Sequence, residues 1–510
     1  MARRFTLDQR GAGVLLHVTS LPGRHGSGDL GPAALRFVEF LASAGMRWWQ
    51  TLPIHPIGAG DSPYSSWSAF AGDPLLISLD LLRDEGLLTR EDVAPQRGFS
   101  DRQVRYARTI PYRYERLRRA YVAFTRDAGA AERRAFSRFC TRQREWLDDF
   151  ALFSALKSRY RQRAWTRWPR EVRLSNRQTL LRIRDELADE IRYAQFLQYQ
   201  FARQWSALRE ACEARGVGLV GDLPIFVSLD SADVWARREL FRLDASGRPV
   251  VVSGCPPDAF AKTGQLWGHP HYAWPRHQAE GFAWWIARFR RVASLFHATR
   301  IDHFLGFHRC WTVPGRAKNA IRGTWTLTPG HALFRTVRRR LGRLEIVAED
   351  LGIVTPEATA LREKFGFPGM RVLQQGFGEH SRYDQPHNWP RNCVAYTGTH
   401  DTDTTVGWFE RLRRSRRRGA DGLTVFERAK RYLHSSGRAI HWDMVRTLYA
   451  SVANTVIVPM QDLLGLGTEA RMNVPATPRG NWRWRMRRGA AGARLARRLR
   501  ELGRTYERCE

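Results

Sequence analysis

Short apolar runs alternate with amphipathic segments along most of the 510-residue chain. Runs this short and this apolar are typical of parallel strands buried on both faces. They predict eight strands, at residues 13–18, 48–54, 217–227, 299–304, 344–348, 370–373, 394–398 and 454–460. Because helical stretches separate most of them, the pattern favours a closed (β/α)8 barrel over an open doubly wound sheet.

The clearest helix precedes the fourth predicted strand. Its apolar positions include Phe282, Trp285, Phe289 and Phe296, which recur at helical spacing and therefore share one face. A second helix is expected to begin at Pro32, a residue suited to a first helical turn, and to end before residue 45.

Residues 81–214 do not fit one strand–helix repeat. They are charged, and a long amphipathic segment ends near Gly216. We therefore predict a mostly α-helical insertion within a barrel built from residues 1–80 and 215–510. A second insertion, 228–274, is rich in Gly, Pro and Trp and is expected to be an active-site loop, since loops that follow barrel strands gather at the C-terminal rim.

The chain is strongly basic, with 83 Lys and Arg against 50 Asp and Glu. Such a charge raises the alternative of a non-catalytic protein that binds nucleic acid or glucan. Only five of the basic residues are lysines, and the arginines are spread over the whole length. Residues 483–500 are the one candidate basic segment and fit a terminal helix with a solvated face better. We predict no nucleic-acid partner.

No stretch approaches the roughly 18 to 20 apolar residues that span a bilayer. The charged residues 1–10 are followed by no apolar segment of the kind a secretory signal needs. The six cysteines are far apart and form no CxxC pair, so we expect reduced thiols. These features predict a soluble cytoplasmic protein without membrane association, either a monomer or a weak homo-oligomer.

Acidic residues recur at the C-terminal ends of predicted strands: Asp222, Asp302, Glu349 and Asp401. Burying a carboxylate costs several kcal/mol unless it is paired or used. Each acid could simply cap the helix that follows. With Arg300 two residues before Asp302, however, a shared polar site explains the set better.

Paired carboxylates suit cleavage of a glycosidic bond. A protonated one donates to the leaving oxygen, while an ionised one attacks the anomeric carbon or activates a water. Alternate strand residues share a face, so Arg300 can keep Asp302 ionised. The rival use is metal binding, but EF-hand and HExxH spacings are lacking, and we predict neither metal nor cofactor. Loop aromatics are expected around the acids to pack on sugar rings: Tyr64, Trp67, Phe260, Trp267 and Trp274.

Several motifs, in order along the chain, carry a family resemblance. They are GVLLHVTSLPG (13–23), GDSPYSSWSAFAG (60–72), GDLPIFVSLDSADVW (221–235), PPDAFAKTGQLWG (256–268), RIDHFLGF (300–307), VAEDLG (347–352), GFPGMRVLQ (366–374), THDTDTT (399–405) and QDLLGLGTEARMN (461–473), followed by GNWRWRM. In these the chain resembles the amylomaltases, the 4-α-glucanotransferases also called disproportionating enzymes.

The resemblance implies a retaining (β/α)8-barrel enzyme of the α-amylase clan without a C-terminal β-domain. Such an enzyme cuts α-1,4-glucans or malto-oligosaccharides and passes the donor segment to the 4-OH of glucose or another glucan. It implies Asp302 as nucleophile, Glu349 as general acid/base and Asp401 as the acid that holds the 2- and 3-hydroxyls. The implied binding residues are Tyr64, Arg300 and His400 on the donor side, Phe260, Gln265, Trp267, His303 and Asn473 on the cleavage and acceptor side, and Asp222 in support.

Four positions depart from the family pattern. Ala259 stands where Tyr is common, in the loop over the acceptor side, and Ala59 replaces an aromatic that some members use in a secondary glucan site. His269 and Thr402 stand where Asn is usual. None of these departures touches the three acids.

Overall fold

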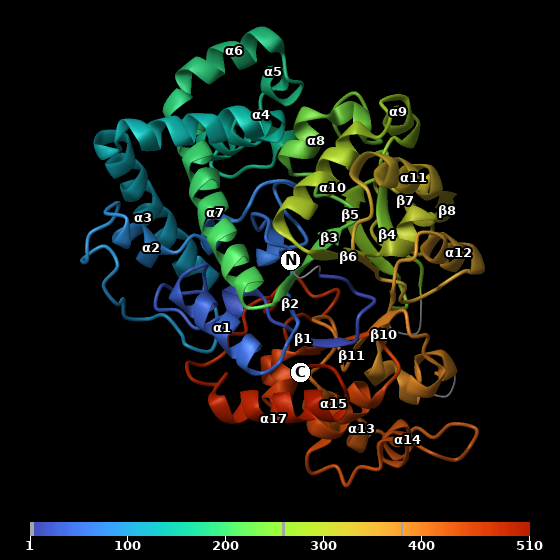
Figure 1. Cartoon of the computed structure of the whole chain (residues 1–510). Coiled ribbons are helices and arrows are strands. Elements are labelled where there is room, and N and C mark those ends of the chain that lie inside the picture. The colour runs from blue at the N-terminus through green and yellow to red at the C-terminus, as the bar shows by residue number, and fades with distance from the viewer. Residues whose placement is uncertain (1–4, 258–260, 379–380) are drawn as a thin grey trace.

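A closed barrel of eight parallel strands forms the centre of the computed structural model, which describes residues 5–257, 261–378 and 381–510 (Figure 1). In order around the barrel the strands are β1 (Gly11–Leu15), β2 (Trp48–Gln50), β3 (Gly218–Pro224), β6 (Ala298–Asp302), β9 (Ile346–Ala348), β10 (Gly369–Val372), β11 (Cys393–Tyr396) and β12 (Thr455–Pro459), which pairs back with β1. Each predicted strand contributes one of them, so the predicted (β/α)8 barrel is confirmed.

Trp48 shows why small residues stand at particular points of the barrel wall. It is fully buried on β2 and pairs with Gly13 on one side and Gly218 on the other. A Cβ at Gly13 would lie 2.5 Å from the Cβ of Trp48. A side chain at that position would therefore push β1 and β2 apart, and the close approach requires glycine.

Helices surround the barrel as its outer layer (Figure 1). They include α1 (Pro32–Ser43), α8 (Ala232–Ala236), α9 (Trp274–Ala279), α10 (Ala283–Leu295), α11 (Gly330–Leu341), α12 (Pro356–Lys364), α13 (Thr405–Arg414), α14 (Val425–Leu433), α15 (Ile440–Ala450), α16 (Met460–Leu463) and α17 (Ala493–Thr505). The predicted apolar face of α10 is buried, with Trp285 and Phe289 among its core residues. The helix predicted at Pro32 begins there as α1.

The chain between β2 and β3 is irregular over much of residues 51–105 and mostly helical from Tyr106 to Ala214. It forms α2 (Leu79–Asp84), α3 (Tyr106–Asp127), α4 (Ala130–Arg159), α5 (Arg170–Arg173), α6 (Arg177–Glu186) and α7 (Ala188–Ala214). Helices α4 and α7 pack against each other, and the Trp205 indole of α7 donates to the carbonyl of Leu295 on α10 at 3.0 Å. No helix within the described ranges is long and apolar enough to cross a bilayer.

A small antiparallel sheet on the barrel was not predicted. Its order is β5–β4–β7–β8, from β4 (Val251–Cys255), β5 (Gln265–Pro270), β7 (Arg309–Pro314) and β8 (Thr324–Leu327). The expectation that Trp267 lies on a loop is wrong, because it is a residue of β5. These strands are short and rich in Gly and Pro, and their pairing shifts register between Val252 and Gly254, so no regular alternation marks them in the sequence.

Candidate active site

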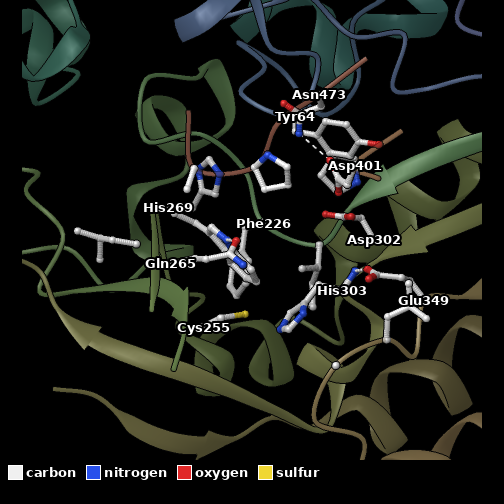
Figure 2. Close-up of a pocket in the computed structure, with 18 of the residues that line it drawn as sticks. Tyr64, Phe226, Cys255, Gln265, His269, Asp302, His303, Glu349, Asp401 and Asn473 are labelled. Atoms are coloured by element: carbon white, nitrogen blue, oxygen red, sulfur yellow. Dashed lines mark hydrogen bonds between the residues drawn. The ribbon is translucent and has the colours of Figure 1, made fainter. Parts of the chain in front are cut away.

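An open cavity of about 620 Å³ lies where the barrel strands end (Figure 2). Asp302 is the last residue of β6, and Glu349 directly follows β9. Both acids line the cavity together with Asp401. The other sequence-predicted residues in its wall are Tyr64, Gln265, Trp267, His303, His400 and Asn473. Asp222 and Arg300 lie buried behind this wall, and Phe260 falls outside the described residues.

Arg300 links three of the acids. Its Nη1 donates to both carboxylate oxygens of Asp222 at 2.8 and 2.7 Å, and its Nη2 donates to Asp302 Oδ1 at 3.0 Å. The same Nη2 lies 3.5 Å from Glu349 Oε2. Burial alone would lower the pKa of Arg300, but the carboxylates around it hold that pKa well above its usual value. One permanent cation therefore fixes the Asp302 and Glu349 carboxyl groups close together.

Asp222 holds Arg300 in place from behind the cavity wall. Its side chain is fully buried, and besides the two bonds from Arg300 it accepts a hydrogen bond from the Tyr64 hydroxyl at 2.7 Å. Burial raises the pKa of Asp222, and the Arg300 guanidinium opposes that rise. With both oxygens bonded, Asp222 serves to hold Arg300 and Tyr64 in place and does not line the cavity itself.

The surroundings of Glu349 favour its protonated form. Burial raises the pKa of Glu349 to about 8, and the neighbouring Asp302 adds to that rise. The backbone N–H of His303 donates to Glu349 Oε2. His303 has a left-handed backbone, with φ of 53°, which turns the chain sharply after Asp302. Glu349 therefore holds a proton at neutral pH and can act as an acid.

Asp401 projects into the cavity from the segment after β11, with 43% of its side chain exposed. Asn473 Nδ2 donates to Asp401 Oδ1 at 2.6 Å, which is the bond drawn in Figure 2. His400 Nε2 lies 3.4 Å from the other oxygen. Burial lowers the pKa of His400 and so favours the neutral imidazole. The Asn473 amide thus orients Asp401, and the His400 imidazole lies beside the other oxygen, while the carboxylate stays open to a ligand.

Aromatic and imidazole rings line two sides of the acids. The Tyr64 ring stacks on His400, with centroids 5.2 Å apart and planes at 12°. Opposite them, Trp267 meets the His303 ring edge-on at 4.8 Å, and its indole donates to Gln265 at 3.3 Å. Flat apolar surfaces beside carboxylates suit sugar rings, which present both C–H faces and hydroxyls.

Trp482 lines the cavity although the sequence did not single it out. Its ring lies 5.5 Å from Tyr64 and 5.9 Å from His400. The only signal was its place in the motif GNWRWRM. Phe226, 6.3 Å from Trp267, and His269 also line the cavity and were not predicted to bind. Burial lowers the pKa of His269 to about 4, so it is neutral at physiological pH.

Two of the expected aromatics lie elsewhere. Trp274 begins α9 and stacks on the fully buried Trp285 at 5.9 Å, so it belongs to the core. The ammonium of Lys157 lies 5.2 Å from the Trp67 ring centroid. Trp67 lines a separate cavity next to the helices between β2 and β3. The expectation that Trp67 and Trp274 surround the acids is therefore wrong, because segments that connect barrel strands also cover the core.

We expect Tyr64→Phe to lower the free energy of unfolding by about 1 to 3 kcal/mol, because a buried carboxylate loses a donor. The measurement is the midpoint and enthalpy of thermal unfolding by calorimetry. Tyr432→Phe is the matched control, since the Tyr432 hydroxyl contacts His387 in an exposed position. Equal losses in the two variants would contradict the supporting role of the Tyr64–Asp222 bond.

The barrel and its carboxylate cavity define the class, an enzyme of the α-amylase clan. Residues 16–491 match the family model described as 4-alpha-glucanotransferase, and the chain belongs to this family. A 4-alpha-glucanotransferase of Thermus thermophilus is 43% identical over 510 residues, or 98% of this chain and 99% of that protein. One from Synechocystis sp. is 44% identical over 486 residues, 94% of each chain.

Solved structures of amylomaltases are similar to this chain as well. An amylomaltase from Streptococcus agalactiae, in complex with acarbose, has a TM-score of 0.94 and 37% identity, covering 98% of this chain and all of that one. An amylomaltase from Corynebacterium glutamicum has a TM-score of 0.77 at 20% identity, which shows the shared fold. The resemblance found in the sequence motifs is therefore confirmed. Within the described ranges no group of three His, Cys, Asp or Glu side chains is arranged to bind a metal ion.

Proposed function

We propose that this protein transfers a segment of an α-1,4-glucan from a donor malto-oligosaccharide to the 4-OH of glucose or another glucan, by a retaining double displacement. The observation that carries the proposal is the pair of carboxyl groups beside Arg300, those of Asp302 and Glu349, which differ in their surroundings. Glu349 is partly buried and has a raised pKa, whereas Asp302 accepts a charge-assisted bond, and both face the cavity. An acid and a nucleophile side by side are what a retaining mechanism needs.

In the first step Asp302 attacks C1 of the donor sugar. Glu349 gives its proton to the glycosidic oxygen, the C1–O bond breaks, and a β-glycosyl ester forms on Asp302. Asp401, oriented by Asn473, accepts hydrogen bonds from the sugar hydroxyls. The Tyr64–His400 stack offers a flat surface to the same ring.

In the second step the roles reverse. The ionised Glu349 takes the proton of the acceptor 4-OH, whose oxygen attacks C1 and releases the Asp302 carboxylate. A water molecule in the same place would give hydrolysis. We attribute the preference for transfer over hydrolysis to Gln265, Trp267 and His303 in the cavity wall. Binding of the acceptor sugar by these residues positions its 4-OH for attack on C1 in preference to water.

Incubation with maltotriose tests this function. We expect glucose and longer oligomers to appear while the number of reducing ends stays constant, since transfer conserves glycosidic bonds. Chromatography gives the products, and a reducing-sugar assay counts the ends. A rise in reducing ends that keeps pace with the release of glucose would identify a hydrolase instead.

Trp267→Ala is expected to lower the ratio of transfer to hydrolysis by about tenfold or more, because a buried aromatic contact is worth about 1.5 to 3 kcal/mol. The ratio follows from the two maltotriose assays together. Trp442→Ala on α15, whose ring lies under Arg498, is the control for loss of an indole elsewhere. An unchanged ratio in Trp267→Ala would remove this residue from the acceptor side.

We also propose that the protein works in the cytoplasm on malto-oligosaccharides, in line with its thiol-state cysteines. The Streptococcus agalactiae amylomaltase, whose structure was solved in complex with acarbose, supports a sugar ligand in the cavity, because this chain covers it completely at a TM-score of 0.94.

A further inference from the structure

Two cysteines occupy facing positions in the small antiparallel sheet. Strands β4 and β7 pair with Ser253 opposite Thr312 and Gly254 opposite Trp311. Continuing this register by one residue places Cys255, the last residue of β4, opposite Cys310 on β7. Directly opposed residues of an antiparallel pair project from the same face of the sheet. The two side chains are therefore neighbours.

The face they share is the one toward the barrel. On the other face, Val252 and Val313 form an apolar cluster against which Trp311 packs. Because side chains alternate along each strand, the two cysteines point the opposite way. Cys310 is 2% exposed, and its Sγ donates to the Gly306 carbonyl at 3.0 Å. Cys255 lines the active-site cavity, where Figure 2 shows its sulfur.

We propose that Cys255 and Cys310 are a modification site, at which a peroxide that enters the active-site cavity forms a reversible disulfide between β4 and β7. Both residues are thiols in this structure. Opposed residues in antiparallel strands have Cα atoms about 4.5 to 5.5 Å apart, which falls within the about 4.4 to 6.8 Å that a disulfide spans. A pair that continues the printed register of β4 and β7 is therefore within bonding range.

The order of the chemistry follows from exposure. Cys255 meets the peroxide first: its thiolate attacks the O–O bond, becomes a sulfenic acid, and the released hydroxide takes up the thiol proton as water. The Cys310 sulfur then attacks the sulfenic sulfur, the S–O bond breaks, and a second water leaves with the Cys310 proton. Two thiols are oxidised and one peroxide is reduced to two waters. Burial raises the pKa of Cys310, which keeps most of it as the thiol and slows its attack on the sulfenic sulfur.

The bond would act on the catalytic acids through two connections. It removes the hydrogen bond from Cys310 to Gly306, in the turn Phe304–Phe307 that follows His303, and His303 donates its N–H to Glu349. It also pulls on Cys255, which pairs with Gln265 of the acceptor wall. We therefore expect oxidation to slow the enzyme. Only this consequence rests on the proposed function, because the cross-link itself is detected without an assay of activity.

The experiment treats the full-length chain with hydrogen peroxide and then divides the sample. One half is blocked, digested and searched by mass spectrometry for a peptide joined through Cys255 and Cys310. The other half is assayed before and after dithiothreitol. We expect the joined peptide, and a loss of activity of about tenfold or more that the reductant reverses, since a displacement of about 1 Å can cost about a hundredfold in rate.

Single variants separate a disulfide from other oxidation. Cys255→Ser and Cys310→Ser should both resist inactivation, measured relative to their own untreated rates, and neither should yield the joined peptide. Cys140→Ser, at a half-buried position on α4, should respond as the unaltered protein does. Inactivation of Cys310→Ser at the original rate, or no joined peptide from the oxidised protein, would overturn the proposal. A joined peptide with full activity would overturn the effect on rate.

Discussion

Replacing Asp302 with Asn is expected to lower turnover at least about a thousandfold while the protein stays folded. Catalytic residues act together, so removal of the nucleophile alone abolishes most of the rate enhancement. The amide cannot form the glycosyl ester. It also presents either an oxygen or an NH₂ group to Arg300 Nη2, which now donates to Asp302 Oδ1 at 3.0 Å. The measurement is the initial rate with maltotriose, with circular dichroism to confirm the fold.

Azide makes this experiment specific for the nucleophile. In Asp302→Ala, which also removes the volume of the side chain, azide can enter from the face that Asp302 occupied and displace fluoride from α-maltosyl fluoride in one step. The expected product is therefore the β-azide, with inverted configuration at C1. Asp127→Asn, at the exposed end of α3, should keep full activity and give no β-azide. Near-normal turnover in Asp302→Asn, or an azide of retained configuration, would assign the nucleophile elsewhere.

The barrel and two of the acids, Asp302 and Glu349, could be predicted because both leave local marks in the sequence, whereas Asp222 lies inside β3 and Asp401 lies five residues beyond β11. A buried parallel strand is a continuous apolar run, and an acid directly after such a run stands out. Asp302 ends β6, and Glu349 follows β9, as that reasoning requires. The spacing of Arg300 and Asp302 likewise indicated a shared face, and the two side chains are hydrogen-bonded.

What escaped prediction depends on partners distant in sequence or on backbone angles. The sheet β5–β4–β7–β8 joins segments on both sides of β6, and no property of one segment reveals the other. The left-handed backbone of His303 is unusual for a residue with a side chain. The local sequence therefore does not predict that its N–H donates to Glu349. Trp274 and Trp482 each stand near Pro and Arg in the sequence, which does not reveal that the first packs in the core and the second lines the cavity.

Replacing Glu349 with Gln is expected to have the second large effect, and one that depends on the leaving group. With maltotriose we expect a loss of about a hundredfold or more, because proton transfer from a positioned acid contributes about 10² to 10⁴. Fluoride needs little protonation to depart, so α-maltosyl fluoride should still form the ester on Asp302. The ester then accumulates, because the base of the second step is missing, and mass spectrometry of the quenched protein measures it.

Two further readouts of Glu349→Gln distinguish an acid/base from a residue that only shapes the cavity. Azide needs no base, so it should restore turnover of the fluoride and give the α-azide, the opposite anomer from that expected with Asp302→Ala. In the unaltered protein, kcat/KM for maltotriose should fall as pH rises through about 8, the raised pKa of Glu349, because the proton to be donated is lost. The variant cannot lose that proton, so this alkaline fall should disappear. Glu210→Gln, at an exposed position on α7, should keep the fall in place. Two results would contradict the acid/base role of Glu349: an alkaline fall in kcat/KM that persists in Glu349→Gln, or no rescue of that variant by azide. Replacing a group that only shapes the cavity would neither abolish the alkaline fall nor make turnover depend on azide.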